Sequence, residues 1–331
     1  MNMLNSVHAN YKEGRRILAP LLGFPAVKPA GTSIKLAQQN AGEHMKVMQR
    51  IVEKWHPDVV FTLMDLSVEA SALGRETIFP PDEAATIVKF DYDKERDLSL
   101  LKAINILEDG RLQSYVETHK RMKRDFPGDI LRGAYVTGPY TLAGLIMGAE
   151  NAAMETMMDP EGFHVLCTVC TEKILDYTQA MIEAGAHIIA VLEPSAMMLG
   201  PEQFREFSMD YTRKIVDMCH QHDVGMVYHI CGNTDHLLES LNDSGADALS
   251  LDSDVNFPQA AKMIREDMIL IGNICPTGTI MTGHPESVQK EVQKLLEDMK
   301  DIPNYILSTG CDLPSEVPEE NVTAFMETGR K

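Results

Sequence analysis

The chain contains 331 residues, of which 44% are hydrophobic, and its formal net charge is −19. This length and apolar content suffice for a large globular enzyme, and a closed barrel is a single domain that reaches this size. The acidic balance argues against a nucleic-acid partner, because phosphate backbones are bound mainly through lysine and arginine side chains.

Residues 1–57 precede the first predicted strand and contain helical material. Their first residues lack the apolar stretch and the small-residue cleavage site of a secretory signal. No later apolar run approaches the ~20 residues that a membrane-spanning helix needs. We therefore expect a cytoplasmic protein with no membrane partner, in which residues 1–57 form an N-terminal helical extension packed across the remaining domain.

Residues 58–331 alternate short β-rich runs with amphipathic segments. The amphipathic segments, such as Glu202–Gln221 and Pro285–Met299, have apolar residues three and four apart. Strands are predicted over Val59–Met64, Thr86–Phe90, Ile130–Val136, His187–Leu192, Val224–Ile230, Ala248–Leu251, Met268–Gly272 and Tyr305–Ser308. Eight strands that are each followed by a helix indicate an α/β fold, a TIM (β/α)8 barrel, with one domain over residues 1–331. The second strand fits this pattern least well, because a charged stretch (Asp91–Asp97) follows it.

Polar residues follow the predicted strands, at the end of the barrel where such enzymes place their active sites. In chain order they are Asp65, Glu69, Thr137, Glu193, His229, Cys231, Asp252, Asp254, Asn273, Cys275, Cys311 and Asp312. The sequence therefore predicts a functional site at the carboxyl ends of the strands.

Three of these residues form a set that suits a metal ion. His229 and Cys231 are two apart at a strand end, so their side chains point to the same side, and Cys311 follows the last strand. One imidazole and two thiolates suit Zn²⁺, and three protein ligands leave a fourth position open for water or substrate. Each residue taken alone is more simply a buried histidine or a core cysteine, but packing gives no reason for all three to lie at strand ends. We expect a catalytic zinc site.

The remaining candidates have open alternatives. Glu193 is expected to be catalytic, either hydrogen-bonded to a zinc ligand or a transient ligand itself, and Asp65 either orients substrate or bonds loop backbone. Asp252 has the same two alternatives. The turn from Thr137 to Thr141 either holds an anionic group on exposed amides or only starts a helix.

The other cysteines and histidines favour structural roles. Cys275 is expected to line the pocket without binding the metal. Cys167 and Cys170 lie three apart within a predicted helix and share one apolar face, which is typical of core packing. His220 and His222 end a helix, where a cationic side chain suits the helix dipole.

Several motifs together resemble the uroporphyrinogen decarboxylase superfamily, and within it the methylcobalamin:coenzyme M methyltransferases. The resemblance spans nearly the whole chain. It includes Asp65-Leu-Ser-Val-Glu69, Gly138-Pro-Tyr-Thr141, Tyr228–Asn233, Gly272-Asn273, Gly310-Cys311-Asp312-Leu-Pro314 and Pro318-Glu-Glu-Asn321. The methyltransferase branch is marked by an H-x-C…C zinc motif that His229, Cys231 and Cys311 match. Cys275 departs from the pattern, because many members carry an acidic or small residue there.

The resemblance implies that zinc activates a small thiol, such as coenzyme M, whose sulfur takes a methyl group from methylcobalamin or another methylated corrinoid. It also implies that a separate small corrinoid protein carries the donor. Thr137, Tyr140, Asp252, Asn273 and Cys275 are then expected to contact substrate or corrinoid.

Other functions remain open. A tetrapyrrole decarboxylase is disfavoured because Arg15-Arg16 does not match the arginine-rich R-Q-A-G-R run of true decarboxylases. A non-catalytic corrinoid- or metal-binding protein is the third possibility. The methyl acceptor is not fixed by the sequence, and a folate stays open beside a thiol.

Overall fold

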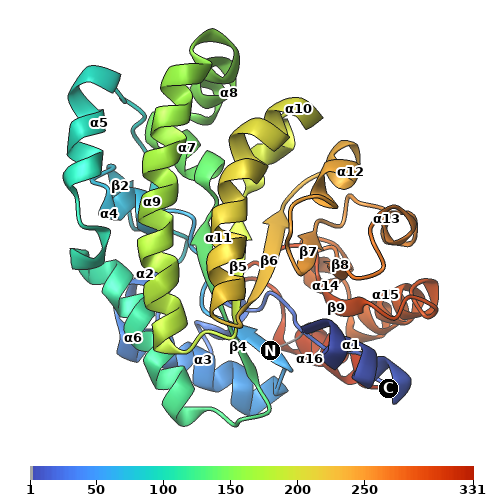
Figure 1. The fold of residues 1–331 in the computed structure, drawn as a ribbon. Helices are drawn as coiled ribbons and strands as arrows, with labels where there is room; N and C mark the ends of the chain where they lie inside the picture. Colours follow the sequence, from blue (N-terminus) through green and yellow to red (C-terminus); the bar gives the residue numbers. More distant parts are fainter. Residues whose placement is uncertain (1–2) are drawn as a thin grey trace.

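Seven parallel strands form the central sheet of the computed structural model, which describes residues 3–331 (Figure 1). In sheet order they are β1 (Val59–Phe61), β4 (Leu131–Thr137), β5 (Ile188–Leu192), β6 (Gly225–Ile230), β7 (Ala248–Leu251), β8 (Ile269–Ile274) and β9 (Tyr305–Thr309). The sheet curls, with helices on its outer face, and confirms the predicted α/β TIM-barrel class. Each strand is almost fully buried, as expected where both faces of a parallel sheet are covered.

The gap between β9 and β1 is filled by an extended segment from the N-terminal part of the chain, residues 17–21. Leu18 forms a parallel bridge with Leu307 of β9, and its carbonyl accepts the amide of Asp58 at 3.0 Å. The amide of Leu307 donates to the carbonyl of Ile17 at 3.0 Å. This segment therefore closes the barrel, so residues 1–57, expected as a helical extension, also contribute a barrel wall.

The predicted strand Thr86–Phe90 is wrong as a barrel strand. β3 (Thr86–Ile87) pairs antiparallel with β2 (Thr77–Ile78) in a separate two-stranded sheet. A central parallel strand is buried on both faces, whereas here Val88 and Phe90 are exposed, and the charged stretch that follows belongs to the surface.

Helices surround the sheet and form the outer layer of the barrel (Figure 1). The longer ones are α1 (Met3–Lys12), α2 (Ile34–Gln39), α3 (Ala41–Trp55), α5 (Lys94–Ala103), α6 (Gly110–Asp125), α7 (Pro139–Met147), α8 (Ala149–Met158), α9 (Pro160–Ala184), α11 (Asp210–Gln221), α13 (Phe257–Met263), α15 (Pro285–Asp298) and α16 (Glu319–Gly329). Short helices are α4 (Val68–Ala72), α10 (Pro201–Phe204), α12 (Leu238–Leu241), α14 (Thr279–Thr282), η1 (Phe24–Ala26), η2 (Ile106–Glu108), η3 (Pro194–Met198) and η5 (Asp235–Leu237). Among residues 3–331, no helix is long and apolar enough to cross a membrane.

Local sequence signals explain several helix ends. Asp159 caps α9 by accepting the amide of Gly162 at 3.0 Å, and Gly185 ends the same helix with a φ of +103°. The predicted helix Glu202–Gln221 continues from α10 into α11 through one π-helical stretch, η4 (Arg205–Met209). The side chain of Asp159 and the backbone of Gly185 therefore set the two ends of α9.

The core consists of a helix–sheet layer and a separate cluster inside the barrel. Within the barrel, Phe61 stacks on Tyr135 with ring centroids 4.9 Å apart. Helix α1 covers one end of the interior, where Met3 and Val7 join this cluster. The interior is thus a packed apolar core below the polar mouth.

Gly133 of β4 lies so close to Phe61 that an added Cβ would come within 2.2 Å of the ring. Gly133→Ala is therefore expected to lower the free energy of unfolding by about 1–3 kcal/mol, the usual cost of overpacking a core. The measurement is urea or thermal unfolding of the variant beside the parent protein. Gly128→Ala is the matched control, because nothing lies within 4 Å of its added Cβ. Equal stability of the two variants would contradict this packing.

Candidate metal centre at the barrel mouth

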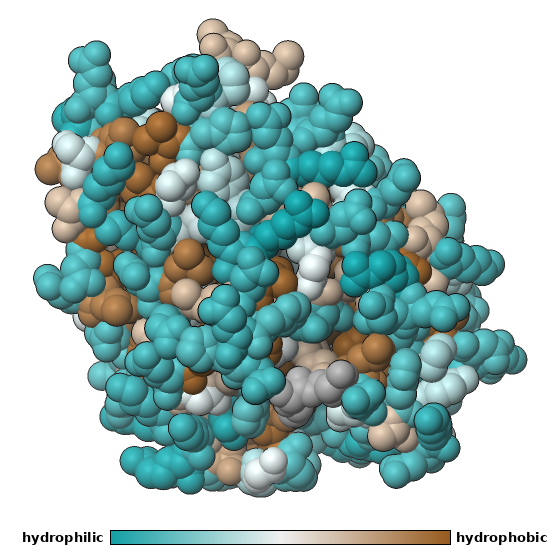
Figure 2. Space-filling model, viewed as in Figure 1, coloured by the Kyte–Doolittle hydropathy of each residue, from teal (hydrophilic) through white to brown (hydrophobic). Residues whose placement is uncertain are grey.

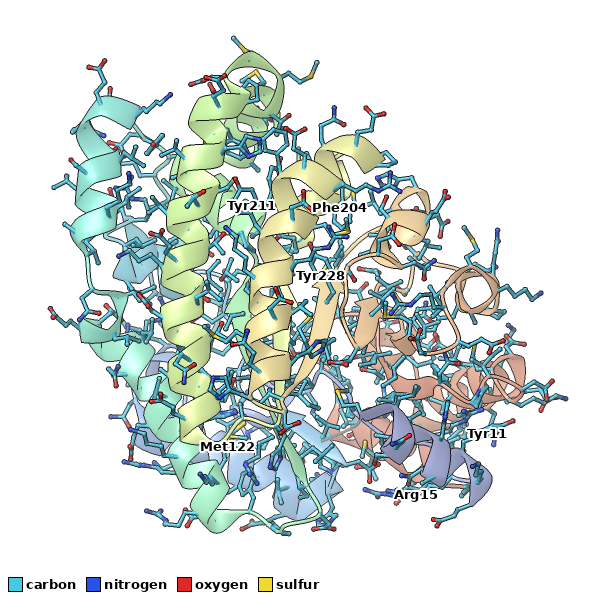
Figure 3. The ribbon with its side chains drawn as sticks, viewed as in Figure 1. Tyr11, Arg15, Met122, Phe204, Tyr211 and Tyr228 are labelled. Carbon is cyan, nitrogen blue, oxygen red and sulfur yellow. The ribbon has the colours of Figure 1, made fainter. Side chains whose placement is uncertain are left out.

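Strand β6 carries His229 into the barrel because its neighbour Tyr228 is anchored outward. Tyr228 is fully buried, and its hydroxyl lies 2.7 Å from that of Ser208. Phe204 stacks on Tyr228 with ring centroids 6.0 Å apart (Figure 3), so β6 is tied to α10 through Phe204 and to η4 through Ser208. Side chains alternate along a strand, and His229 therefore points to the opposite, inner side.

The orientation of the His229 ring is fixed by a hydroxyl on the adjacent strand. Nδ1 of His229 lies 2.9 Å from Oγ of Ser250, its register partner on β7. This contact leaves Nε2 directed at the two thiols. A hydrogen bond to the second ring nitrogen is the usual way that proteins fix the tautomer of a metal-binding histidine.

The two cysteines complete a compact group of three donor atoms. Sγ of Cys231 lies 3.2 Å from Nε2 of His229 and 3.2 Å from Sγ of Cys311. Cys311 Sγ lies 3.8 Å from the same ring nitrogen. His229 is buried, whereas both cysteines are partly exposed. The structure therefore brings together all three residues that the sequence predicted as metal ligands.

Backbone contacts hold the loops that carry the cysteines. Asp252 accepts the amide of Gly232 at 2.9 Å, directly after Cys231. Asn273 donates to the carbonyls of Asp252 and Val255 at 3.0 and 2.8 Å, and so fixes the loop after β7. Both residues were expected to contact substrate or corrinoid, and both are partly exposed, but their contacts shape the loops around the thiols.

The other cysteine, Cys311, is held in a loop that leaves no room for a larger neighbour. A Cβ on Gly310 would come within 2.5 Å of the backbone nitrogen of Ser253. Asp312 accepts the amides of Gly23 and Leu313 at 3.3 and 3.1 Å, which ties the loop to the N-terminal part of the chain. Burial and the neighbouring Cys311 raise the pKa of Asp312 well above its ordinary value.

The hydrogen bond between the two thiols shifts their pKa values in opposite directions. The hydrogen bond from Cys231 lowers the pKa of Cys311, and the contact with His229 acts in the same direction. The pKa of Cys231 is raised, first by the same hydrogen bond and then by burial. The pair therefore favours one thiolate and one thiol, and binding of a cation would release the remaining proton.

The donor set fits zinc. Among residues 3–331, His229, Cys231 and Cys311 are the one group of this kind whose ligand atoms all lie within 4.8 Å of one another. Tetrahedral zinc with Zn–S bonds of ~2.3 Å needs donor atoms roughly 3.5–3.8 Å apart, close to the separations found here. The site therefore needs little rearrangement to hold the ion.

Asp65, predicted as catalytic, is the centre of a buried hydrogen-bond cluster. Its carboxylate forms an ion pair with Arg111 of α6 and accepts the hydroxyl of Tyr115 at 3.0 Å. It also accepts the amide of Ser67 at 2.9 Å. Sequence reasoning missed Arg111, since an arginine in the first turn of an amphipathic helix is typical of a surface cation. These contacts fix the loop after β1.

Glu69 and Thr137 form a second buried pair. Glu69 of α4 accepts both the amide of Thr137, at 2.7 Å, and its hydroxyl, at 2.8 Å. Burial raises the pKa of Glu69 to about 7. The hydroxyl of Thr137, which was expected to contact substrate, thus donates its hydrogen bond to Glu69.

Glu193, predicted as catalytic, caps helix α7. Its carboxylate accepts the amide of Thr141 in the first turn, and a Cβ on Gly138 would collide with this carboxylate. Burial raises the pKa of Glu193 to about 7. Tyr140 in the same turn is fully buried against Phe163, edge to face at 5.9 Å. Tyr140 therefore packs the core and offers no exposed surface to a corrinoid, contrary to expectation.

The remaining sequence candidates lie outside the donor group. Cys275 is partly exposed, with its sulfur 3.8 Å from the hydroxyl of Thr277, and it is not a member of the metal-binding group. Cys167 and Cys170 are fully buried in α9, as the packing interpretation expects. His220 pairs with Asp247 at 3.2 Å on the surface.

Comparisons with known proteins were made for the whole chain. A family model described as uroporphyrinogen decarboxylase (URO-D) matches residues 24–331. A methylcobamide:CoM methyltransferase from Methanosarcina acetivorans is 29% identical over 248 residues, which cover 74% of this chain and 71% of the relative. A uroporphyrinogen decarboxylase from Aliivibrio salmonicida is 27% identical over 314 residues, which cover 90% of this chain and 85% of the relative. The solved structure of a methyltransferase from Methanosarcina mazei superposes with a TM-score of 0.87 at 22% identity, over 98% of each chain, and shows a shared fold.

The Ser250 contact predicts a change in metal affinity. Ser250→Ala should weaken zinc binding by about tenfold, because the His229 ring loses the group that orients it. The measurement is zinc competition with a chromophoric chelator. Ser99→Ala, at an exposed position on α5, is the control. Unchanged affinity in Ser250→Ala would show that the hydroxyl does not hold the ring.

The buried Glu69 carboxyl predicts a pH dependence of stability. Its pKa in the folded protein, about 7, lies above the ordinary value of 4.5, so the folded state keeps a proton that the unfolded state has released between these values. Stability is therefore expected to fall as pH rises through this window, by at most about 1.4 kcal/mol per pH unit for one group.

Glu69→Gln should make this slope shallower but leave the part that the buried Glu193 contributes, as measured by urea unfolding at intervals from pH 4.5 to 7.5. The exposed Glu161→Gln on α9 is the matched control. A variant with the same slope as the parent protein would place the pH dependence in another group.

Proposed function

Because the chain belongs to the uroporphyrinogen decarboxylase (URO-D) family, we propose that it is a zinc-dependent methyltransferase that transfers a methyl group from a protein-bound corrinoid to a small thiol. The relative from Methanosarcina acetivorans supports the predicted class, a corrinoid-dependent methyltransferase of this family. We propose three further details, namely that the reaction depends on zinc, that the acceptor is a small thiol and that a separate protein carries the corrinoid.

One observation carries the proposal, namely the convergence of His229, Cys231 and Cys311 at the barrel mouth. Their separations of 3.2 to 3.8 Å suit one ion, and the partial exposure of both cysteines leaves one side of the group open. An open side is typical of a catalytic rather than a structural zinc site. A closed four-ligand site would instead favour the non-catalytic alternative.

Zinc bound to this group would supply Lewis acidity that lowers the pKa of an acceptor thiol and makes the thiolate available at neutral pH. In the proposed transfer the sulfur–carbon bond forms as the cobalt–carbon bond breaks. The electron pair of the broken bond stays on cobalt, and the thiol proton goes to solvent. The anionic sulfur ligands suit a nucleophile that must remain reactive.

The surrounding residues position this site. Ser250 fixes the ring of His229, and Asp252 and Asn273 fix the loop beside Cys231. Asp252, Asn273 and the partly exposed Cys275 remain our candidates for contact with substrate or corrinoid. Asp65 and Glu193 act on the mouth through the loops and helix that they hold, which makes them positioning residues.

The proposed methyl donor is a corrinoid on a small separate protein that docks over the barrel mouth. Coenzyme M is the first acceptor to test, because the Methanosarcina relatives are named for it. Another small thiol or a folate is an alternative acceptor for the same site.

A second candidate function is decarboxylation of a tetrapyrrole, which the decarboxylase relative from Aliivibrio salmonicida favours. Decarboxylation has no need of two thiols and an imidazole arranged around one point. A purified protein without zinc that decarboxylates uroporphyrinogen would select this second function.

Purified protein is expected to contain one zinc per chain and to demethylate methylcobalamin when a thiol is supplied. His229→Ala, Cys231→Ala and Cys311→Ala should each lose zinc and at least about a hundredfold of activity, because the group that activates the thiol is lost. Zinc is measured by elemental analysis and demethylation by the absorbance change of the corrinoid, against a panel of coenzyme M, other thiols and tetrahydrofolate.

Cys167→Ala is the matched control, since this cysteine is buried in α9 outside the donor group. It should keep both zinc and activity. Full activity in a zinc-free Cys231→Ala protein would contradict the proposal.

A further inference from the structure

Large apolar side chains interrupt the otherwise hydrophilic surface of the protein (Figure 2). Met197 and Met198 are consecutive residues at the end of η3, the short helix that follows β5 and Glu193, and they expose 38% and 50% of their surface. Solvent-exposed apolar groups that adjoin a polar site commonly mark the place where a partner or ligand is received.

Met197 lies against the loop that carries a metal ligand. Its Cε, Cγ and Sδ atoms come within 3.2, 3.3 and 3.7 Å of the position that a Cβ on Gly232 would occupy. Gly232 has a φ of +79° and follows Cys231 directly, and Asp252 holds its amide. The methionine side chain therefore rests on the turn beside the donor group, with part of its surface still open.

A methyl transfer at this site constrains where the donor lies. For the thiol sulfur to meet the methyl carbon in line, the face of the corrin ring has to sit over the donor group. The side chains next to the Cys231–Gly232 turn are then covered by the ring. Methionine suits this contact, because its unbranched, polarizable chain adapts to an uneven apolar surface such as the face of a puckered macrocycle.

We infer that Met197 and Met198 form an apolar contact surface for the corrin ring and set its position above the metal centre. The inference depends on the proposed function and adds to it the residues that receive the donor. Both methionines act by positioning, since they contact the ring and take no part in the bonds that form or break. In the free protein they are partly exposed, and the bound ring would cover them.

The experiment uses free methylcobalamin as the probe and the full zinc-loaded chain. Met197→Gln and Met198→Gln keep the side-chain length but make it polar, and each should raise the Kd and KM for methylcobalamin by about tenfold, because apolar burial is lost. Zinc content and kcat at saturating donor should stay within about twofold of the parent. Met197→Leu and Met198→Leu should restore the Kd, and Met263→Gln is the control, at a 45% exposed position on α13.

The possible results separate the two proposals. Glutamine variants that hold zinc and bind methylcobalamin as tightly as the parent would overturn the inference and leave the proposed function intact. Failure of the zinc-loaded parent to bind or demethylate methylcobalamin would overturn both. The inference is supported if the glutamine variants bind methylcobalamin more weakly and the leucine variants recover the parent's affinity. Met263→Gln should bind it as the parent does. Equilibrium dialysis without thiol gives the Kd independently of turnover.

Discussion

The donor atoms of the candidate metal centre come from strands that are not neighbours, and the curl of the sheet is what brings them together. His229 and Cys231 belong to β6 and its loop, whereas Cys311 follows β9, with β7 and β8 between them. Across a flat sheet, strands three positions apart lie roughly 14 Å from each other. The separation of 3.2 Å between the two sulfur atoms therefore depends on barrel curvature and on loops that lean inward over the mouth. The contacts of Asp252, Asn273 and Gly310 hold these loops in that arrangement.

Seven of the predicted strands, and the grouping of His229, Cys231 and Cys311 at the barrel mouth, were predictable from sequence for a common reason. Buried parallel strands are continuous β-rich runs, and the polar residues that end them face the mouth. The segment that fills the eighth place in the barrel was not predictable, because Ile17–Leu21 is short, contains Pro20 and lies next to helical sequence. The apolar run between Arg16 and Gly23 was the available signal. Ser250 was also missed, since a serine inside a β-rich run has no distinctive spacing and gains its role only from its register with His229.

The acidic residues at the mouth show the limit of that pattern. Glu69, Glu193 and Asp65 all follow strands, as catalytic carboxylates would, yet each accepts hydrogen bonds that hold a neighbouring loop or helix. Buried amides at such loops and helix starts need acceptors, and a carboxylate supplies two oxygen atoms. Polar residues at strand ends therefore mark the site without identifying which residues take part in its chemistry.

The segment around Leu18 also has a consequence for biosynthesis. A ribosome makes this barrel wall early, but its partner Leu307 is added almost three hundred residues later. Any sheet formed by the earlier strands has unpaired edges until β9 is made, and such edges invite pairing with other chains. The same delay applies to Cys311, so the metal centre cannot assemble before the barrel can close. His229 and Cys231 are therefore made before Cys311, and the complete three-residue group forms only once the last strand is in place.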